Sequence, residues 1–580
     1  ISIGNPFTLG ENGTGTNSLR ANFLDVVNIN AGQNNNKGVK ATSVYPSNVQ
    51  VEKFSERALL SGQTGRQNVD GVVISYGKSG SDLSKTVLNT RGTSASKLHG
   101  VNMFNYDIRG LTNGTITPTG VSAYLVYTKT ANASNNSVLN STSSMLGISA
   151  VSIVNSTGPQ GLVSLNNTAS PAASSAGQTG LVARLWTYSG LDGSTAKSGG
   201  INATTPVGIL FTFSDVDLIS NGNPLPVVAD FFSFGYTNDG VKASDRVNNM
   251  IVRIEAEETG DNTGVFEGTL EYVMVNQLNV LDISVYNGTS PISDEATFVV
   301  NDDLDDNDSP RVNYIDLGSD GVQTQVSDQE AAPTHSGTVS FDKPNYKIAD
   351  TVKITLEDQD LNTDVDLIDV YTVVSTSGNA LYDVVGKTGL PILSNGDYLG
   401  RLLDITFDDE RWLNSQQSLT DGSCGASSSP SSGSNGLAAS GFTLVESSAA
   451  SGIFTGDFQV PAQYCARAAD ANTADTDPMT STTGKDLEVN YVDFRDASGN
   501  VVEIGDGAGI RANTGSVSLD RTVYPVPFGN INDASPGSTT PNGKSIFPTH
   551  STARSGNIDS TSEILTEGDL TVTIQVNDPD

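Results

Sequence analysis

Short runs in which apolar and polar residues alternate recur along this chain of 580 residues. One run reads Thr-Val-Lys-Ile-Thr-Leu-Glu over residues 351–357, and another covers residues 121–127. A period of two is typical of a β-strand with one buried face. Stretches rich in Gly, Ser, Thr, Asn and Asp separate the runs, and these residues favour turns. The pattern therefore predicts an all-β protein.

From about residue 205 onward the chain repeats itself. An alternating strand that ends in Asp-x-Asp occurs three times, and its acidic pairs are Asp215 with Asp217, Asp358 with Asp360, and Asp578 with Asp580. A second block, Glu-x-x followed by Gly-x-Phe-x-Gly, occurs over residues 258–270 and 446–458. A third, which opens with Gly-x-Val-Ser, occurs over residues 337–346 and 515–524. Self-similarity of this kind indicates a modular architecture.

The expected fold is a tandem array of Ig-like β-sandwich domains with long loop insertions. Residues 1–202 form a β-rich, sequon-rich region of one or two sandwiches, and residues 203–310 form an Ig-like domain that ends in an acidic linker. Residues 311–512 form a further Ig-like domain with an inserted loop at 413–441. Residues 513–580 are expected to begin another domain. Both chain ends are expected to be cuts in a larger exported polypeptide.

Charge is distributed unevenly along the chain. The 65 acidic and 31 basic residues give a net charge of −34. Residues 1–200 contain 8 acids and 14 bases, a net of +6, so residues 201–580 contain 57 acids and 17 bases, a net of −40. Such an acidic body repels nucleic acid and collects cations. Solubility in salty surroundings is the alternative explanation.

The Asp-x-Asp turn after residue 357 is the sharpest candidate site. Oxygen ligands at alternate positions can converge on one Ca²⁺ ion, and here they are Asp358, Asp360, Asn362 and Asp364. Thr363 stands where an EF-hand requires Gly, and a strand precedes the loop, so the site is not an EF-hand. The alternative is a solvated turn whose side chains cap their own backbone.

Other acidic groups could bind the same cation. The linker after Val300 has Asp303, Asp305, Asn307 and Asp308 as candidate ligands, and a flexible hydrated linker is the alternative. The Asp-x-Asp pairs of the other two repeats, Asp215 with Asp217 and Asp578 with Asp580, are equivalent candidates. Asp493 and Asp496 fit turn positions better.

Two kinds of covalent modification are expected of an exported protein. Ten Asn-x-Ser/Thr sequons are candidate glycosylation sites, at Asn12, Asn113, Asn132, Asn135, Asn140, Asn155, Asn166, Asn202, Asn287 and Asn307. Cys424 and Cys465 are the two cysteines of the chain, and they either form a disulfide or remain thiols.

Catalytic signatures are missing from the sequence. The three histidines lie far apart, no zinc-binding His-x-x-x-His occurs, and no Gly-x-Ser-x-Gly elbow occurs. We therefore expect no catalytic residues and no enzymatic activity.

Four segments carry a family resemblance: 346–362, 451–456, Tyr-Val-Asp-Phe-Arg-Asp-Ala-Ser-Gly at 491–499, and 519–528. They resemble the S-layer proteins of ammonia-oxidising archaea, and the resemblance covers about residues 205–580. It implies a secreted glycoprotein that forms a porous two-dimensional lattice over the cell, depends on divalent cations, and is anchored to the membrane elsewhere in the full chain.

Composition and resemblance together predict a structural protein of the extracellular cell surface. Its main partner is expected to be itself, in a homo-oligomeric S-layer lattice stabilised by Ca²⁺. The acidic pores would attract small cations such as ammonium, while nucleic acid would be repelled. An Ig-like adhesin or an extracellular filament subunit is the alternative.

Overall fold

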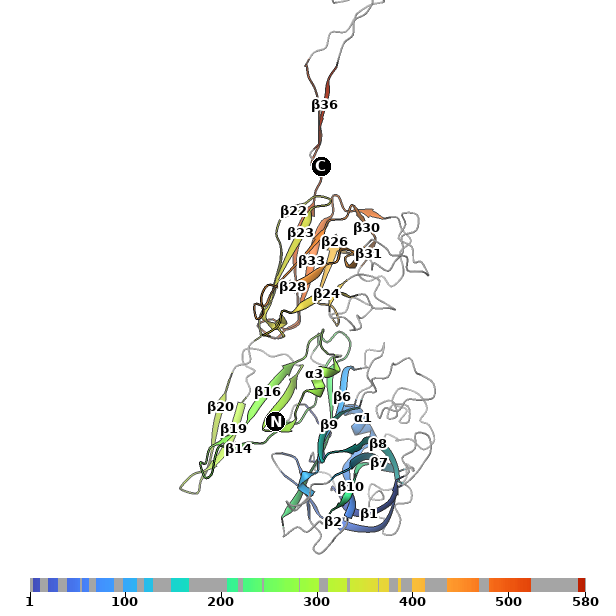
Figure 1. Cartoon of the computed structure of the whole chain (residues 1–580), viewed down its shortest axis with the longest axis vertical. Helices are drawn as coiled ribbons and strands as arrows, with labels where there is room; N and C mark the ends of the chain where they lie inside the picture. Colours follow the sequence, from blue (N-terminus) through green and yellow to red (C-terminus); the bar gives the residue numbers. More distant parts are fainter. Residues whose placement is uncertain are drawn as a thin grey trace, which may run out of the picture.

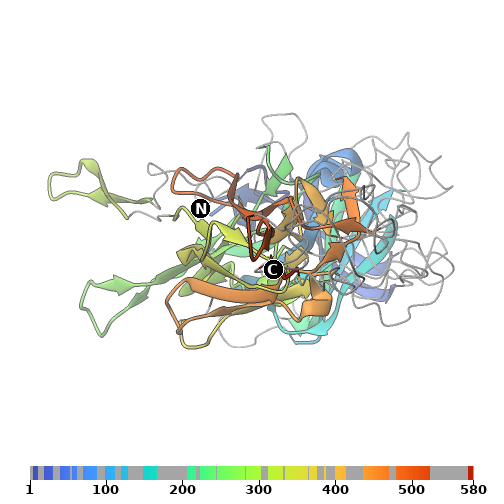
Figure 2. The ribbon, with the colours of Figure 1, turned by 90° about the horizontal axis from the view of Figure 1, so that it is seen from above.

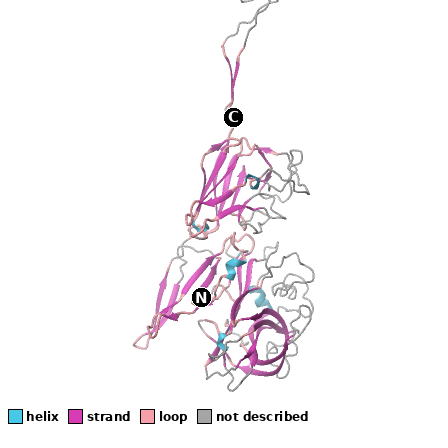
Figure 3. Ribbon diagram, in the orientation of Figure 1, coloured by secondary structure: helices cyan, strands magenta, loops and turns pink. Residues whose placement is uncertain are grey.

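The structure is a computed structural model that describes residues 4–578, except for 11–18, 30–38, 53–54, 62–68, 88–97, 112–118, 129–147, 166–205, 217–222, 243–244, 281, 302–310, 331–333, 364, 375–383, 387–398, 413–435, 469–478 and 523–571. Strands dominate it, and the few helices are short (Figure 3). The predicted all-β fold is confirmed. No helix among the described residues is long and apolar enough to cross a membrane.

The first unit, here called the N-terminal sandwich, consists of two antiparallel sheets (Figure 1). One sheet has the order β2 (Val39–Ser47), β1 (Ala21–Ile29), β5 (Val69–Ser79), β10 (Pro206–Val216), β7 (Val121–Thr128) and β8 (Ile148–Thr157). The other has the order β3 (Val49–Val51), β4 (Ala58–Ser61), β11 (Pro224–Tyr236), β6 (His99–Asp107) and β9 (Gln160–Ser164), and β12 (Arg246–Asn248) also pairs with β11.

Aromatic side chains from both sheets fill the space between them. Phe211 of β10 lies near Phe104 and Tyr106 of β6, with ring centroids 6.5 and 6.0 Å apart. The short helices α1 (Gly80–Thr86) and η1 (Arg109–Leu111) follow β5 and β6. Ser79 caps α1 and forms a capping box with Asp82, which explains why β5 ends there.

The strand order differs from the domain boundary expected at residue 203. β10 lies between β5 and β7, and β11 lies between β4 and β6. Both strands are therefore internal to the sandwich that the first 165 residues begin. Because of the sequence repeat, residues 208–217 were assigned to the second predicted domain. Both edges of β10 pair with strands of the N-terminal sandwich, so β10 belongs to that sandwich.

A smaller middle unit follows. Its elements are β13 (Arg253–Ile254), β14 (Glu257–Glu258), β15 (Phe266–Glu267), β16 (Thr269–Met274), α3 (Ile283–Asn287), β17 (Ile292–Ser293) and β18 (Glu295–Val300). β14 and β15 form a hairpin, and β16 pairs with β18 in parallel. A second hairpin, β19 (Arg311–Leu317) with β20 (Gln323–Gln329), pairs only with itself among the described residues. The two hairpins project as separate arms (Figure 2).

The third unit, here called the C-terminal sandwich, contains one large curled sheet. Its order is β21 (Thr338–Phe341), β23 (Thr351–Glu357), β29 (Ile453–Gln459), β28 (Thr443–Glu446), β24 (Val370–Val374), β25 (Val384–Gly386), β26 (Leu403–Phe407), β33 (Asp486–Asp493), β34 (Val502–Ile510) and β22 (Asn345–Tyr346). Smaller elements complete the unit: η3 (Gln359–Leu361), β27 (Glu410–Trp412), η4 (Ala438–Ser440), β30 (Gln463–Tyr464), β31 (Ala466–Ala468) and β32 (Thr480–Ser481).

β23 shows how the alternating sequence builds this core. Val352, Ile354 and Leu356 are completely buried, whereas Thr351, Lys353 and Glu357 are exposed. Beyond this sandwich, β35 (Ser516–Leu519) pairs with β36 (Ile574–Asn577) in an antiparallel hairpin, here called the terminal hairpin. The hairpin β19–β20 lies outside the large sheet, although the predicted domain 311–512 included it.

A third hydrophobic cluster, here called the shared core, joins the units. It contains Val101, Met103, Phe232, Phe234 and Tyr236 from the outer face of the β11–β6 sheet, residues of the middle unit that include Val275, Tyr286 and Val299, and Leu399, Val492 and Phe494 from the C-terminal sandwich. All of these side chains are buried. The units are therefore packed against one another through a common hydrophobic core.

Candidate functional site

The end of β33 belongs to two hydrophobic cores at once. Val489 and Tyr491 lie in the core of the C-terminal sandwich, whereas Val492 and Phe494 lie in the shared core. Successive side chains of a strand point to opposite faces, so one strand can serve both cores. The motif at 491–499, which carries the family resemblance, is thus the place where the C-terminal sandwich meets the other two units.

Phe494 is the centre of this junction. Its ring meets Tyr236 of β11 edge to face, with centroids 5.3 Å apart. The Arg246 guanidinium lies over the same ring, 5.7 Å from its centroid. Both contacts reach the N-terminal sandwich, and such aromatic and cation–π pairs add to the apolar burial.

Hydrogen bonds fasten the middle unit to the same strand. The Gln277 side-chain amide donates to the Val492 carbonyl oxygen over 3.2 Å, and the Gln277 carbonyl oxygen accepts from the Gly400 N–H over 3.1 Å. Arg495 donates to the Val300 carbonyl oxygen over 3.4 Å. Gln277 and Arg495 are both buried, so these bonds are made away from water.

Buried carboxylates stand beside this junction. Asp358 Oδ1 accepts a hydrogen bond from the Asp360 N–H over 2.8 Å, which caps η3. Asp358 Oδ2 accepts from the Tyr491 hydroxyl. The Asp358 N–H donates to the Gly452 carbonyl oxygen over 2.8 Å. Asp358 therefore ties three segments of the C-terminal sandwich together.

Two further aspartates hold the segment that leads into β21. Asp360 accepts from the His335 N–H over 2.9 Å and contacts His335 Nδ1 over 2.7 Å. Asp493 accepts from the Gly337 N–H over 2.8 Å and from the Arg495 N–H over 3.0 Å. The entry to the C-terminal sandwich is thus fixed by carboxylate hydrogen bonds.

Burial makes ionisation of these groups costly. It raises the pKa of Asp358 to about 7; neighbouring Asp493 and Asp360 raise it further, while the bond from Tyr491 opposes the shift. Burial likewise raises the pKa of Asp493 to about 6, aided by Asp360 and Asp496. Burial and the charge of Asp358 also raise the pKa of Tyr491. Each pKa unit corresponds to about 1.4 kcal/mol.

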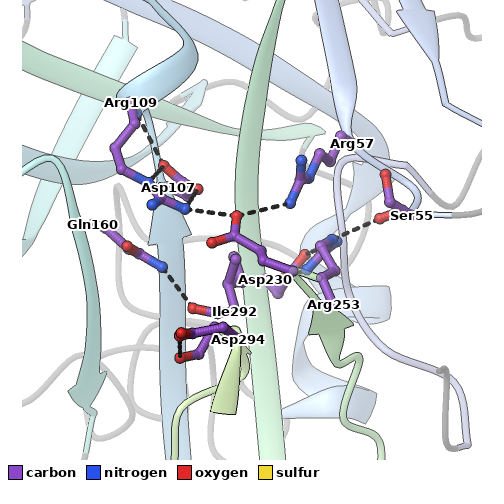
Figure 4. Close-up of polar contacts among 11 residues, drawn as sticks. Ser55, Arg57, Asp107, Arg109, Gln160, Asp230, Arg253, Ile292 and Asp294 are labelled. Atoms are coloured by element: carbon purple, nitrogen blue, oxygen red, sulfur yellow. Dashed lines mark hydrogen bonds and ion pairs between the residues drawn. The ribbon is translucent and has the colours of Figure 1, made fainter. Parts of the chain in front are cut away.

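A second polar junction joins the middle unit to the N-terminal sandwich (Figure 4). Arg253 of β13 pairs with Asp230 of β11 over 2.6 Å, and both side chains are almost fully buried. Arg253 also donates to the Ser55 carbonyl oxygen over 2.6 Å. A buried pair of this kind favours one arrangement, because losing either partner strands a charge in the interior.

More exposed contacts surround that pair. Arg109 contacts Asp107 over 2.8 Å and Glu255 over 2.9 Å, and Arg57 contacts Glu255 over 3.5 Å. The Gln160 side chain donates to the Ile292 carbonyl oxygen over 2.9 Å. Gln160 of β9 therefore holds β17, while Arg109 of η1 and Arg57 hold Glu255 beside β13 (Figure 4).

Only part of the predicted cation site can be placed. Asp358, Asp360 and Asn362 share the turn around η3, and the Asp358 side chain caps that turn. Asp578 lies directly after β36. Asp215 lies in β10, and its side chain is not described. Outside the described residues are Asp217, Asp303, Asp305, Asn307, Asp308, Asp364 and Asp580.

Among the described residues, no group of three or more His, Cys, Asp or Glu side chains is arranged to hold a metal ion. The amide oxygen of Asn362 is buried and accepts no hydrogen bond there, and the same is true of Asn301 at the start of the acidic linker. These two hard oxygen donors fit a cation such as Ca²⁺.

The modification sites are also partly placed. Asn287 lies at the end of α3 with an exposed side chain. Asn155 lies in β8, with its side chain not described, and the remaining sequons lie outside the described residues. Cys465 is buried and disulfide-bonded. The chain has one other cysteine, Cys424, which lies outside the described residues.

The sequence did not identify three residues of this site, Asp493, Tyr491 and His335. Asp493 was expected in a turn, but it is the last residue of β33 and is buried. Tyr491 and His335 were not linked to the aspartates. Alternation over 486–493 was the available signal for Asp493, because it puts that residue on the inward face with Leu487, Val489 and Tyr491.

Comparison with known proteins adds no evidence on the function of this chain, because no protein-family model and no curated protein matches it.

The raised pKa values predict an unusual pH dependence. Between about pH 4 and 7 the folded protein retains protons on Asp358 and Asp493 that the unfolded chain has lost, so the contribution of these two groups to the free energy of unfolding falls as pH rises. In Asp358→Asn this loss should shrink. Urea unfolding followed by tryptophan fluorescence at pH 4, 5.5 and 7 measures it.

The matched control is Asp457→Asn, at an exposed position of β29. It should keep the wild-type dependence on pH. Equal dependence in wild type and Asp358→Asn would show that Asp358 ionises as readily in the folded chain as in the unfolded chain.

Proposed function

We propose that this chain is a structural protein of the extracellular cell surface that self-assembles into a porous, acidic S-layer lattice. The observation that carries the proposal is the shared core, which packs two sandwiches and the middle unit against one another. A lattice subunit must keep its contact surfaces at fixed positions, so that many weak contacts act together. If the domains moved independently, the conformational entropy lost on ordering them would offset part of that binding free energy.

Exposed strand edges supply surfaces for association. The arm β19–β20 exposes Val312, Tyr314, Ile315, Leu317 and Val326. An isolated two-stranded hairpin is at best marginally stable in water, and unpaired strand edges are ready sites for pairing with another chain. The same edges favour the alternative of a filament subunit, because pairing repeated in one direction builds a fibre.

Calcium is the proposed structural cofactor. The buried amide oxygens of Asn362 and Asn301 each lie within a candidate acidic group and accept no hydrogen bond from the described residues. Asp364 would complete the first group, and Asp303, Asp305, Asn307 and Asp308 the second. A divalent cation at these places would offset carboxylate repulsion beside the junctions of the units.

Cation passage is the proposed consequence of the acidic body. With a net charge of −34, the walls of a lattice made of this chain would concentrate cations such as ammonium and retard anions. The low density of positive charge beyond residue 200 makes the expected selectivity strongest in pores formed by residues 201–580.

Assembly tests the proposal directly. Negative-stain electron microscopy of the purified protein in Ca²⁺ should show ordered sheets that dissolve when a chelator is added. Asn362→Leu, which removes an amide oxygen at similar size, should raise the Ca²⁺ concentration needed. Asn500→Leu, at an exposed turn, is the matched control. Fibres in Ca²⁺ would favour the filament alternative, and dispersed particles would overturn both.

Selectivity can be measured on sheets reconstituted over a porous support. Ammonium should cross faster than nitrite at low ionic strength, and the difference should fall as salt screens the walls, because the Debye length is about 10 Å at 0.1 M. Equal fluxes at low salt would contradict cation attraction while leaving the lattice intact.

A further inference from the structure

The strand that runs through β15 and β16 uses only one of its two edges. The Thr259 N–H donates to the Val265 carbonyl oxygen, and the Thr269 N–H donates to the Asp294 carbonyl oxygen. Odd-numbered residues of this strand therefore turn their backbone groups towards β14 and β18. Because backbone groups alternate in direction along a strand, the even-numbered residues turn theirs to the opposite side. That side of residues 264–272 is here called the open edge.

No strand pairs with the open edge among the described residues. The backbone groups on it belong to Gly264, Phe266, Gly268, Leu270 and Tyr272. Phe266 is 63% exposed and Tyr272 is 43% exposed, so water reaches this side of the strand. The edge ends at Tyr272, because the next even residue, Met274, already accepts a hydrogen bond from the Asn279 side chain. The open edge is thus nine residues long, with Gly268 at its midpoint.

The C-terminal sandwich contains the same edge in a paired state. Glu446 lies opposite Phe454 in β28–β29, as Glu258 lies opposite Phe266 in β14–β15. The other edge of β29 pairs antiparallel with β23, and Phe454 is completely buried. In the repeat of the middle unit the counterpart of β23 is β10, and both edges of β10 are paired with β5 and β7. The open edge therefore receives no strand from its own repeat.

We propose that the open edges of two copies of this chain pair antiparallel about a two-fold axis at Gly268, an inference that rests on the proposed function and names one of its lattice contacts. The register follows from the midpoint of the edge, because only this register uses all nine residues. It places Phe266 opposite Leu270 and Gly264 opposite Tyr272, and the axis forms each of these pairs twice.

Charge selects the same register. With the axis at Gly268, Glu267 lies opposite Thr269 of the second copy, whose hydroxyl can donate to the carboxylate. Moving the axis to Glu267 would put this residue opposite its own copy. Moving it to Thr269 would put Glu267 opposite Glu271. Like charges directly opposite one another destabilise a strand pair, so both neighbouring registers are disfavoured.

The size of the contact suits an assembly made of many weak contacts. Nine residues from each copy, with Phe266 and Leu270 facing each other twice, bury on the order of 1,000 Å², near the lower limit of a specific interface. Backbone hydrogen bonds of strand addition contribute as well. Figure 2 draws the β14–β15 hairpin as a projecting arm, so its edge is accessible to a second copy.

Cysteine cross-linking tests the register. Two full-length proteins, Glu267→Cys and Thr269→Cys, are mixed under assembly conditions and oxidised with copper phenanthroline. One carries a size tag. Cys465 is already disulfide-bonded and does not compete. A cross-linked heterodimer should dominate the non-reducing gel. Val265→Cys mixed with Thr269→Cys, two residues out of register, is the matched control and should give at least tenfold less.

The outcomes separate this inference from the proposed function. Sheets that form without the heterodimer overturn the strand pairing alone. Heterodimer in dispersed particles, without sheets, supports the pairing and overturns the lattice. Efficient cross-linking of Glu267→Cys to Thr324→Cys of β20, in place of Thr269→Cys, would assign the open edge to a different strand and overturn the two-fold contact.

Charge substitutions give an independent readout, the monomer–dimer equilibrium of the dispersed protein in analytical ultracentrifugation. Thr269→Glu puts a carboxylate opposite Glu267 twice and should raise the dimer dissociation constant about tenfold. Mixing Thr269→Glu with Glu267→Lys should restore association as a heterodimer. Asn313→Glu, at an exposed position of β19, is the matched control and should change nothing. Equal weakening by Thr269→Glu and Asn313→Glu, or failure of the lysine variant to restore the dimer, would overturn the pairing.

Discussion

The shared core is the constraint on which the rest of the structure depends. Strands β11 and β33 both have two buried faces: one belongs to their own sandwich, and the other to this common cluster. If the outer faces of β11 and β33 were polar and exposed, each sandwich would be a separate domain. Because Phe232, Phe234 and Tyr236 share one buried cluster with Val492 and Phe494, the three units form one packed body. Burial of about 150–250 Å² per aromatic residue makes such a cluster a strong apolar joint.

Polar groups then select one arrangement among those that apolar packing would allow. The Arg253–Asp230 pair fixes the middle unit on β11, and the hydrogen bonds of Asp358, Asp360 and Asp493 fix the entry to the C-terminal sandwich. The raised pKa values of Asp358 and Asp493 show that the buried carboxylates carry a desolvation cost. Precise positioning is therefore gained at some expense in stability, which would suit the lattice subunit that we propose.

Period-two alternation predicted the strands well, and the repeated blocks fold into hairpins of the same register, in which Glu258 lies opposite Phe266 and Glu446 lies opposite Phe454. Domain membership was harder, because equivalent strands take different partners: β10 pairs with β5 and β7, whereas β23 pairs with β21 and β29. Long-range pairing depends on residues far apart, which a local pattern does not contain. For the same reason the turn at Asp358 was found, while the burial of Asp493 beside it was not.

Small-angle X-ray scattering of the dispersed protein tests the central claim, that the shared core makes the units one body. Wild type should give a narrow distance distribution with one maximum dimension. Phe494→Ala removes an aromatic contact worth about 3–5 kcal/mol in a core. It should lengthen and broaden that distribution while far-UV circular dichroism stays unchanged. Tyr314→Ala, at an exposed position of β19, should leave both signals as they are. Identical scattering from wild type and Phe494→Ala would contradict the account.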